Sequence, residues 1–408
     1  MKDIISKYKE DIKRFRTTGE IETYYGSLFE SGKAFDYRSV KDNLIFVITM
    51  KEKVDGRRLQ EAVNRTVCYC PFITFSVFKD EGSKRFIYRM SDAEYKVFHK
   101  VFPFEYGTEE TGGMFSFVSY QDDKIFFGIS HAITDFGGQY IAARSLLEAY
   151  LGYEVAYKGA ASDLYAADLM KYELPLSDGF KPYKYYDGEV FSIPEECSAP
   201  DGFTEALSMD KAAFDEFTSS LDTTRQISAV ILLAEALTLA YPGNDKMFCF
   251  RCPVDCRKRF GIADSFQNAS MPHAFLYSDP SDTEDLQGTA VRLSKELREQ
   301  ISKDELAYQT NSFARLFRDE EKKDILAYLY EFSLRTGILV SNTGKLFTED
   351  KFACVKDFTV TMNSPFPLSL YVFEVNGKVK ILYIQKFESR EIFNSLQEVI
   401  KKRIGELL

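Results

Sequence analysis

The chain has 408 residues, of which 45% are hydrophobic and 28% are charged, and these proportions are typical of a globular protein. Because a single hydrophobic core stops growing at about 250 to 300 residues, this length predicts two lobes, each with a substantial core. The net charge of −10 argues against a nucleic-acid partner, whose binding requires a basic surface.

The first part of the chain alternates predicted strands and helices. Apolar and β-branched runs predict strands at 44–50, near 73–79, at 84–90 and over 114–130, while apolar residues at helical spacing predict helices at 56–67 and 139–151. The polar residues Gln121-Asp-Asp divide the run 114–130 into two strands, so this segment is predicted to be a hairpin.

The segment 171–203 is the predicted boundary between the lobes, because its prolines and Asp-Gly pairs break regular structure. We therefore expect an N-terminal lobe at 1–172, a linker at 173–203 and a C-terminal lobe at 204–408. The second half is predicted to contain a helix capped by Asp210 and running to Leu221, helices at 226–239 and 284–303, strands at 247–252 and 359–363, a hairpin turning at Asn376-Gly377, and a helix from Ser389. Both halves mix strands with helices, which predicts an α/β fold.

His131 is the first candidate for a catalytic residue. It directly follows the apolar strand 124–130 and precedes Asp135 by four residues. Histidine has an unperturbed pKa close to neutrality, and a nearby carboxylate can fix its orientation, so the pattern is typical of a general base. On the residues alone, two other interpretations stay open: His131 is a hydrogen-bonded core histidine, and Asp135 is the N-cap of the following helix.

Three segments in order along the chain carry a resemblance to a known superfamily. They are Ser130 to Gly138, the run 54–66 followed by Cys70-Pro71-Phe72, and Pro253-Val-Asp-Cys-Arg257-Lys-Arg259 with Ser265-Phe-Gln-Asn268. Together they resemble chloramphenicol acetyltransferase, the condensation domains of peptide synthetases, the plant BAHD acyltransferases and the alcohol acetyltransferase-like proteins. The resemblance extends over residues 43 to about 385.

The resemblance implies a two-lobe chloramphenicol acetyltransferase-like fold, with a mixed sheet in each lobe and an active-site channel between them. The implied reaction moves an acyl group from a coenzyme A thioester to a small-molecule alcohol or amine, without an acyl-enzyme. In it His131 is the general base, while Asp135 and Arg257 form a structural pair at the site. Acyl-CoA is then a co-substrate, and no bound cofactor is expected.

Further residues are candidates for the channel or for stabilising an oxyanion: Ser341, Asn342, Phe136, Gly137 and Asn268. Phe136 departs from the family pattern, which has glycine directly after the aspartate, whereas here Gly137 follows one position later. We expect Phe136 either to narrow the channel or to accompany a rearranged turn. Two alternatives to the acyl-CoA enzyme remain: a condensation-like enzyme whose acyl donor is bound to a carrier protein, and a degenerate member that binds a ligand without turnover.

For the remaining cysteines and histidines, the sequence predicts no metal site and no catalytic partner. Cys249, Cys252, Cys256 and His273 are of the residue types that bind zinc, but residues 249 and 252 of a strand point to opposite faces, so no metal site is predicted. Neither His99 nor His273 has a recognisable partner in the sequence. Arg257, Lys258 and Arg259 are candidates for a local basic patch that would bind coenzyme A.

The sequence predicts a cytoplasmic protein without a membrane span. The first ten residues are charged and lack the apolar core of a signal peptide. The longest apolar run, 228–241, contains Glu235 and is too short to cross a bilayer. An odd number of cysteines, seven, without regular spacing favours reduced thiols over a disulfide framework.

Overall fold

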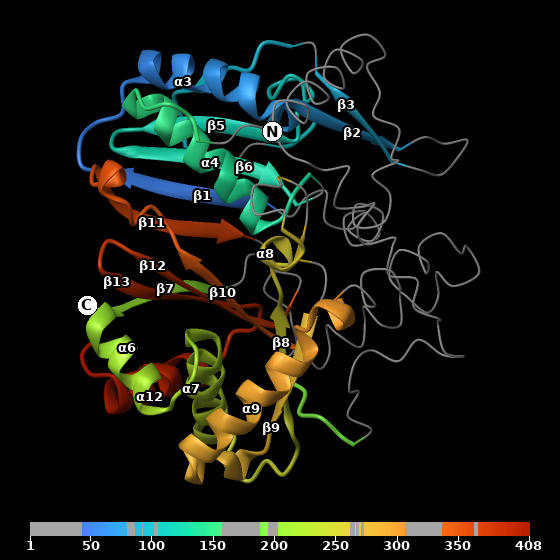
Figure 1. The fold of residues 1–408 in the computed structure, drawn as a ribbon, viewed down its shortest axis with the longest axis vertical. Coiled ribbons are helices and arrows are strands. Elements are labelled where there is room, and N and C mark those ends of the chain that lie inside the picture. Colours follow the sequence, from blue (N-terminus) through green and yellow to red (C-terminus); the bar gives the residue numbers. More distant parts are fainter. Residues whose placement is uncertain are drawn as a thin grey trace.

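Two mixed sheets, each covered by helices, form the protein (Figure 1). The computed structural model describes residues 43–79, 86–91, 93–101, 105–131, 133–156, 188–194, 203–261, 266, 269–270, 273–306, 337–362 and 366–408. The predicted α/β architecture with a mixed sheet in each lobe is confirmed. Of the expected linker 173–203, only residues 188–194 and 203 lie within the described part of the chain.

The first sheet has five strands in the order β11-β1-β6-β5-β4. Its members are β1 (Asn43–Met50), β4 (Val97–Phe98), β5 (Ser116–Gln121), β6 (Lys124–Ser130) and β11 (Val355–Met362). β1 pairs antiparallel with both β6 and β11, and β4 pairs parallel with β5. The C-terminal half of the chain therefore supplies an edge strand to the first lobe, and a division of the chain at 173–203 does not separate the two sheets.

Helices and a small hairpin complete the first lobe. They are α3 (Gly56–Tyr69), the 3₁₀ turn η1 (Pro71–Thr74), the hairpin β2 (Phe75–Lys79) with β3 (Phe86–Met90), and α4 (Phe136–Leu151). The helix α3 begins where the Asp55 carboxylate accepts the N–H groups of Arg57 and Arg58, at 2.9 and 3.1 Å. The helix α4 ends at Gly152, whose φ of 83° is the left-handed conformation that glycine adopts without strain.

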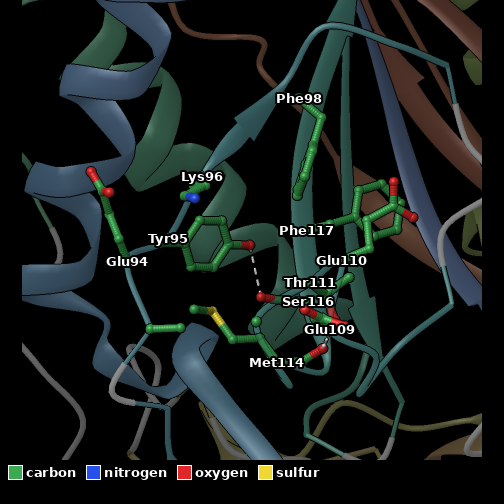
Figure 2. Close-up of a pocket in the computed structure, with 12 residues that line it drawn as sticks. Glu94, Tyr95, Lys96, Phe98, Glu109, Glu110, Thr111, Met114, Ser116 and Phe117 are labelled. Carbon is green, nitrogen blue, oxygen red and sulfur yellow. Dashed lines mark hydrogen bonds between the residues drawn. The ribbon is translucent and has the colours of Figure 1, made fainter.

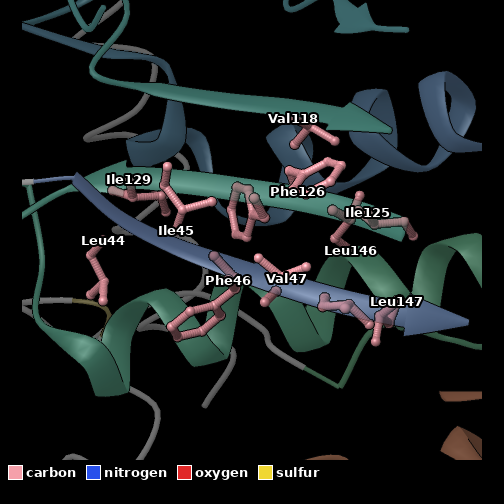
Figure 3. Packing of buried hydrophobic residues seen from close by; sticks show 14 of the residues in the cluster. Leu44, Ile45, Phe46, Val47, Val118, Ile125, Phe126, Ile129, Leu146 and Leu147 are labelled. Atoms are coloured by element: carbon pink, nitrogen blue, oxygen red, sulfur yellow. The ribbon is translucent and has the colours of Figure 1, made fainter. Parts of the chain in front are cut away.

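Buried apolar side chains lie on both faces of the first sheet. Figure 3 shows Phe46 and Val47 of β1, Phe126 and Ile129 of β6 and Leu146 of α4 among them. β6 is buried along nearly its whole length, which explains its continuous apolar sequence. The position of the residue that follows β6 is therefore fixed by a packed, two-sided strand.

The second sheet has six strands in the order β7-β13-β12-β10-β8-β9. They are β7 (Phe203–Asp210), β8 (Phe248–Pro253), β9 (His273–Ser278), β10 (Ile338–Lys345), β12 (Leu368–Val375) and β13 (Lys378–Gln385). Within the described residues, the helices of this half are α6 (Lys211–Ser220), α7 (Arg225–Ala240), α8 (Arg257–Phe260), α9 (Leu286–Gln300) and α12 (Glu391–Arg403), with 3₁₀ turns η2 (Pro280–Glu284) and η4 (Asp350–Phe352).

The two faces of the second sheet have different neighbours. On β12, Leu370 and Val372 belong to the core under α7 and α12, whereas Tyr371 and Phe373 belong to the core shared with the first lobe. On β10, Leu339 likewise belongs to the shared core. Because side chains alternate along a strand, this assignment tells which residues of the second sheet point toward the first lobe.

Most local elements agree with the sequence-based expectations. The predicted hairpin is β5 and β6, and the predicted helix 139–151 begins three residues earlier, at Phe136. Asp210 caps α6 as expected, since its carboxylate accepts from the N–H groups of Ala212 and Ala213. Among the helices in the described part of the chain, none combines the length and the apolar character needed to cross a bilayer.

Candidate active site

His131 is the first residue beyond β6 and begins a tight turn. Ser130 ends the strand opposite Asn43 of β1, and the Ile133 N–H donates to the Ser130 carbonyl at 2.9 Å. Ser130 is fully buried, whereas His131 is partly exposed. The imidazole is thus carried by a rigid strand end while keeping access to solvent, which is where catalytic groups are commonly placed.

Asp135 and Arg257 form a buried ion pair between the two halves of the chain. Arg257 Nη1 lies 2.9 Å from Asp135 Oδ2, and Arg257 Nη2 lies 2.5 Å from Asp135 Oδ1. The two side chains are 1% and 3% exposed, for Asp135 and Arg257 respectively. This two-bond geometry matches the planar guanidinium to both carboxylate oxygens.

The same carboxylate also caps α4. Asp135 accepts from the Gly138 N–H and from the Ala269 N–H, each at 2.8 Å. The two interpretations of Asp135 that the sequence left open, helix cap and partner of Arg257, are therefore both present in the geometry. Burial by itself raises the pKa of Asp135, but the charge and hydrogen bonds of Arg257, with the two backbone N–H groups, hold that pKa below its usual value.

Gly137 and Gly138 leave room for the contacts around Asp135. A Cβ on Gly137 would lie 2.5 Å from Arg257 Nη1, and a Cβ on Gly138 would lie 1.9 Å from Thr134 Oγ1 and 2.1 Å from the Phe266 carbonyl oxygen. The close approach that demands glycine thus falls at 137 and 138 in this chain. No such demand exists at 136, which explains how a phenylalanine is accommodated directly after the aspartate.

Phe136 packs into the first lobe. Its ring lies 4.8 Å, centroid to centroid, from the ring of Phe46, which is fully buried in β1. The expected narrowing of a channel was based on the family pattern alone. The contact with Phe46 gives the aromatic side chain a packing role at the start of α4.

The sequence shows no recognisable partner for His273, but the structure supplies one. Arg251 on β8 donates its Nε–H to Nδ1 of His273, the first residue of β9. The two residues are diagonal neighbours, since Arg251 pairs with Phe275 and Pro253 pairs with His273. Arg251 is buried, and its guanidinium lies 5.0 Å from the ring centroid of Phe366.

His273 interacts electrostatically with His131 of the other lobe. Burial first, then the Arg251 cation, then the His131 charge hold the pKa of His273 well below its usual value. The strand pairing of β8 with β9 is what brings Arg251 to His273, and neither residue carries a motif. Only a correct prediction of that antiparallel register would have found the pair from the sequence.

The segment just before His273 contacts the turn that carries His131. Thr134 Oγ1 donates to the Phe266 carbonyl, and Ala269 donates to Asp135 as described above. The Cys256 N–H donates to the Ala269 carbonyl at 2.8 Å, which ties the same segment to the start of α8. Asn268, a candidate from the sequence, lies outside the described residues.

Ser341 and Asn342 are placed differently on β10. Ser341 pairs with Tyr371 and has the same strand parity as Leu339, so it points toward the first lobe. Asn342 is exposed, and its side-chain oxygen accepts the Gly344 N–H at 3.1 Å. Of the two, Ser341 is therefore the better candidate for lining a channel between the lobes.

Burial distinguishes among the basic residues and cysteines that the sequence singles out. Arg257 is buried and paired with Asp135, so Lys258 and Arg259 are the exposed charges of α8. Burial raises the pKa of the Cys249 and Cys252 thiols to about 12, which keeps both protonated at neutral pH. No three His, Cys, Asp or Glu side chains are clustered for a metal ion within the part of the chain that the structure describes.

A cavity of about 250 Å³ opens on the first lobe (Figure 2). Its wall includes Tyr95, whose hydroxyl lies 2.7 Å from Ser116 Oγ, and the carboxylates of Glu94, Glu109 and Glu110. Ser116 pairs with Ile129, two residues before His131, so the cavity lies at the same end of the sheet as His131. All of its lining residues belong to the first lobe, which separates it from the surface between the lobes.

Comparison with solved structures finds this fold in several enzymes. The chain superposes with TM-score 0.64 and 14% identity on TRI101 of Fusarium sporotrichioides complexed with coenzyme A and T-2, covering 93% of this chain and 96% of that one. The trichothecene 15-O-acetyltransferase TRI3 of the same fungus gives TM-score 0.64 at 11% identity, over 93% and 94% of the two chains. The epimerization domain from the third module of tyrocidine synthetase B gives 0.62 at 14%, over 95% and 96%.

These neighbours have the two-lobe chloramphenicol acetyltransferase-like fold, and this chain has it too. No family model matches the sequence, and a search of curated proteins finds no match. Identities of 11 to 14% define the fold and leave the activity to be inferred from the site.

Proposed function

We propose that the protein is an acyltransferase that moves an acyl group from a coenzyme A thioester to the hydroxyl or amine of a small molecule. The observation that carries the proposal is the placement of His131: it is a partly exposed imidazole at the end of a buried strand, on a turn anchored by the Asp135–Arg257 pair. Two of the solved structures that share the fold are described as an acetyltransferase and as a complex with coenzyme A, which supports the same class.

His131 acts as the general base in the proposed reaction. Its ring takes the proton of the acceptor hydroxyl or amine as the acceptor atom bonds to the thioester carbonyl carbon. The electron pair of the carbonyl moves to oxygen, and when the tetrahedral intermediate collapses, the carbon–sulfur bond breaks. The proton held by His131 then passes to the departing thiolate, so the enzyme returns to its starting state without an acyl-enzyme.

Asp135 and Arg257 have a structural task in this scheme. The Asp135 carboxylate accepts from Arg257 and from the backbone N–H groups of Gly138 and Ala269, and the Arg257 guanidinium also donates to Asp255, so neither charge is available to a substrate. They join the turn of the first lobe to α8 of the second lobe. The pair thereby fixes the position of the turn that carries His131 relative to α8.

The phosphates of coenzyme A require a local basic surface on an acidic protein. Lys258 and Arg259 are exposed on α8, directly after Arg257, and supply positive charge beside the turn that carries His131. We therefore favour coenzyme A over a carrier protein as the source of the acyl group. A carrier-protein-bound donor is the alternative, because condensation-type domains share the fold and the same pantetheine arm would enter the site.

Thiol release from acyl-CoA tests the proposal. The purified protein is incubated with acetyl-CoA or longer acyl-CoAs and a panel of alcohols and amines, and free thiol is measured against controls lacking the acceptor. Acyl-carrier protein serves as the competing donor. Acceptor-dependent release from acyl-CoA supports the proposal, release only from acyl-carrier protein moves the assignment to the condensation-like alternative, and no release from either donor overturns it.

A further inference from the structure

We propose that His273 is a second imidazole of the active site, held by Arg251 in the tautomer that offers an Nε2–H group, and that it donates this hydrogen to the thioester carbonyl oxygen as that oxygen becomes negative. This inference rests on the proposed function and adds to it the group that stabilises the tetrahedral intermediate. It divides the chemistry between two histidines, one from each lobe.

The contact with Arg251 fixes the tautomer of His273. A guanidinium has five N–H groups and no acceptor, so the Arg251 Nε–H can only donate to a ring nitrogen that carries no hydrogen. Nδ1 of His273 is that nitrogen, and the single ring hydrogen of the neutral imidazole must therefore be on Nε2. His273 thus presents a hydrogen-bond donor on the side of the ring that faces away from Arg251.

Strand geometry points this donor toward the first lobe. Cys252, Ala274 and Leu276 belong to the core beneath the helices. Arg251 and His273 directly precede Cys252 and Ala274 on their strands, so they lie on the opposite face. That face also carries Leu339, and Phe366 beside Arg251, both of which are part of the core shared with the first lobe. The electrostatic interaction with His131 agrees with this placement.

Two residues that precede β9 in the chain are bonded to the turn of His131. Phe266 and Ala269 make hydrogen bonds to Thr134 and Asp135, and His273 follows Ala269 by four residues. In the proposed arrangement, a thioester in reach of His131 also contacts the first residue of β9. His273 retains part of its surface exposed, so a ligand has access to the ring.

Burial and the Arg251 cation lower the pKa of His273, so the ring remains neutral where an ordinary histidine would be half protonated. A neutral imidazole whose N–H is fixed by its environment can polarise a carbonyl without giving up its proton. Such a preorganised donor stabilises the oxyanion in proportion to the charge that develops there. His131, by contrast, must present a lone pair, and the two rings cannot exchange roles while Arg251 occupies Nδ1 of His273.

Nitrogen NMR of the imidazoles tests the tautomer without turnover. The chain has just three histidines, so His99→Gln and His131→Gln variants assign every ring signal. We expect His273 to show a protonated Nε2 and an unprotonated Nδ1, with no titration between about pH 8 and pH 5. Addition of acetonyl-CoA, a ketone analogue of acetyl-CoA that cannot transfer its acyl group, should shift the Nε2–H signal of His273. A protonated Nδ1, an ordinary titration or an unmoved signal with the analogue bound would overturn the inference.

Kinetics of three His273 variants test the role. The Gln side chain places an amide N–H close to the position of Nε2, the Asn amide lies near that of Nδ1, and Leu has no donor. We expect His273→Leu and His273→Asn to lower kcat about 10²- to 10³-fold, with KM for the thioester changed less than about threefold, and His273→Gln to recover at least about tenfold of that loss. Equal kcat in His273→Leu and wild type would contradict the assignment.

The two proposals fail in distinguishable ways. If the wild-type protein transfers acyl groups and His273→Leu does so equally well, the function stands and the role of His273 falls. If no acceptor supports turnover but acetonyl-CoA still moves the His273 signal, the function falls and the binding geometry stands. Melting temperatures within about 3 °C of wild type separate a chemical effect from a loss of folding.

Discussion

Arg257 of the second lobe holds both carboxylate oxygens of Asp135 in the first lobe, at 2.9 and 2.5 Å, and Asp135 in turn accepts two backbone N–H groups at 2.8 Å. Four hydrogen bonds therefore converge on one buried carboxylate. Because removal of one member of a buried pair leaves the other charge uncompensated, this cluster is expected to be costly to break at a single point.

A double-mutant cycle measures the pair. Asp135→Asn and Arg257→Gln should each lower the free energy of unfolding by about 3 to 5 kcal/mol, since Arg257→Gln leaves the buried Asp135 carboxylate without its cation and Asp135→Asn leaves Arg257 paired only with the exposed Asp255. The double variant should lose about 1 to 3 kcal/mol less than the sum of the two, as groups in direct contact couple. Denaturant titrations of the four proteins provide the values. Strictly additive losses would show that the contact contributes no coupling.

Acid should weaken the contribution of Asp135. The pKa of this carboxyl in the folded protein lies below its unfolded value of about 3.9, so the unfolded chain binds the proton more readily. The stabilisation is then complete above about pH 4 and is lost as the pH falls through the folded pKa. The stability difference between wild type and Asp135→Asn should therefore shrink below pH 4. A difference that stays constant from pH 7 to pH 3 would contradict the assigned shift.

The Gly137 position should tolerate a side chain only when Arg257 is absent. Gly137→Ala places a Cβ 2.5 Å from Arg257 Nη1, and we expect a loss of about 1 to 3 kcal/mol from overpacking. In the background of Asp135→Asn with Arg257→Ala, the same substitution should be neutral or stabilising by up to about 1 kcal/mol, because alanine favours the first turn of α4. The same loss in both backgrounds would mean that the guanidinium is not the obstacle.

Substitution of Phe136 tests whether its side chain packs in the first lobe or lines a channel. Phe136→Ala removes the contact with Phe46 and should cost about 1 to 3 kcal/mol, less than a fully buried phenylalanine because the ring is partly exposed. KM for acyl-CoA should remain within about twofold of wild type, since the ring is directed into the first lobe. Unchanged stability together with a shifted KM would instead place the ring in the channel.

Charge reversal on α8 tests the basic surface. Lys258→Glu with Arg259→Glu should raise KM for acyl-CoA, and the effect should weaken as salt screens the phosphates. The truncated donor S-acetyl-N-acetylcysteamine carries no phosphate and should be used equally well by both proteins. Lys295→Glu with Lys401→Glu, on α9 and α12, makes the same charge change on other exposed helices and is the matched control. Equal KM values in all three proteins would exclude α8 from binding the donor.

Much of the fold is local enough to be predicted from the sequence. The hairpin β5–β6, the helix after Asp135 and the cap at Asp210 each depend on residues a few positions apart, and all three are present. The sheet to which Val355–Met362 belongs could not be predicted, because the alternation of its side chains fits either sheet and its partner β1 lies some 300 residues earlier.

The part of the candidate site that depends on neighbouring residues could also be predicted from the sequence. His131 and Asp135 are near neighbours in a recognisable pattern, and the partner Arg257 was named from the family resemblance. Arg251 and His273 were missed because their contact depends on the register of β8 against β9, across a connection of about twenty residues. Long-range register is set by packing on both faces of the sheet, and single-sequence patterns do not contain that information.

The central claim is that His131 is the base of an acyl transfer. The most direct measurement is acceptor-dependent thiol release from acyl-CoA by wild type and His131→Ala, each at equal concentration and with its melting temperature recorded. Loss of the base should reduce turnover by roughly 10²- to 10⁴-fold while the melting temperature stays close to wild type, because the partly exposed imidazole contributes little to packing. Near-wild-type turnover by a folded His131→Ala protein would contradict the account.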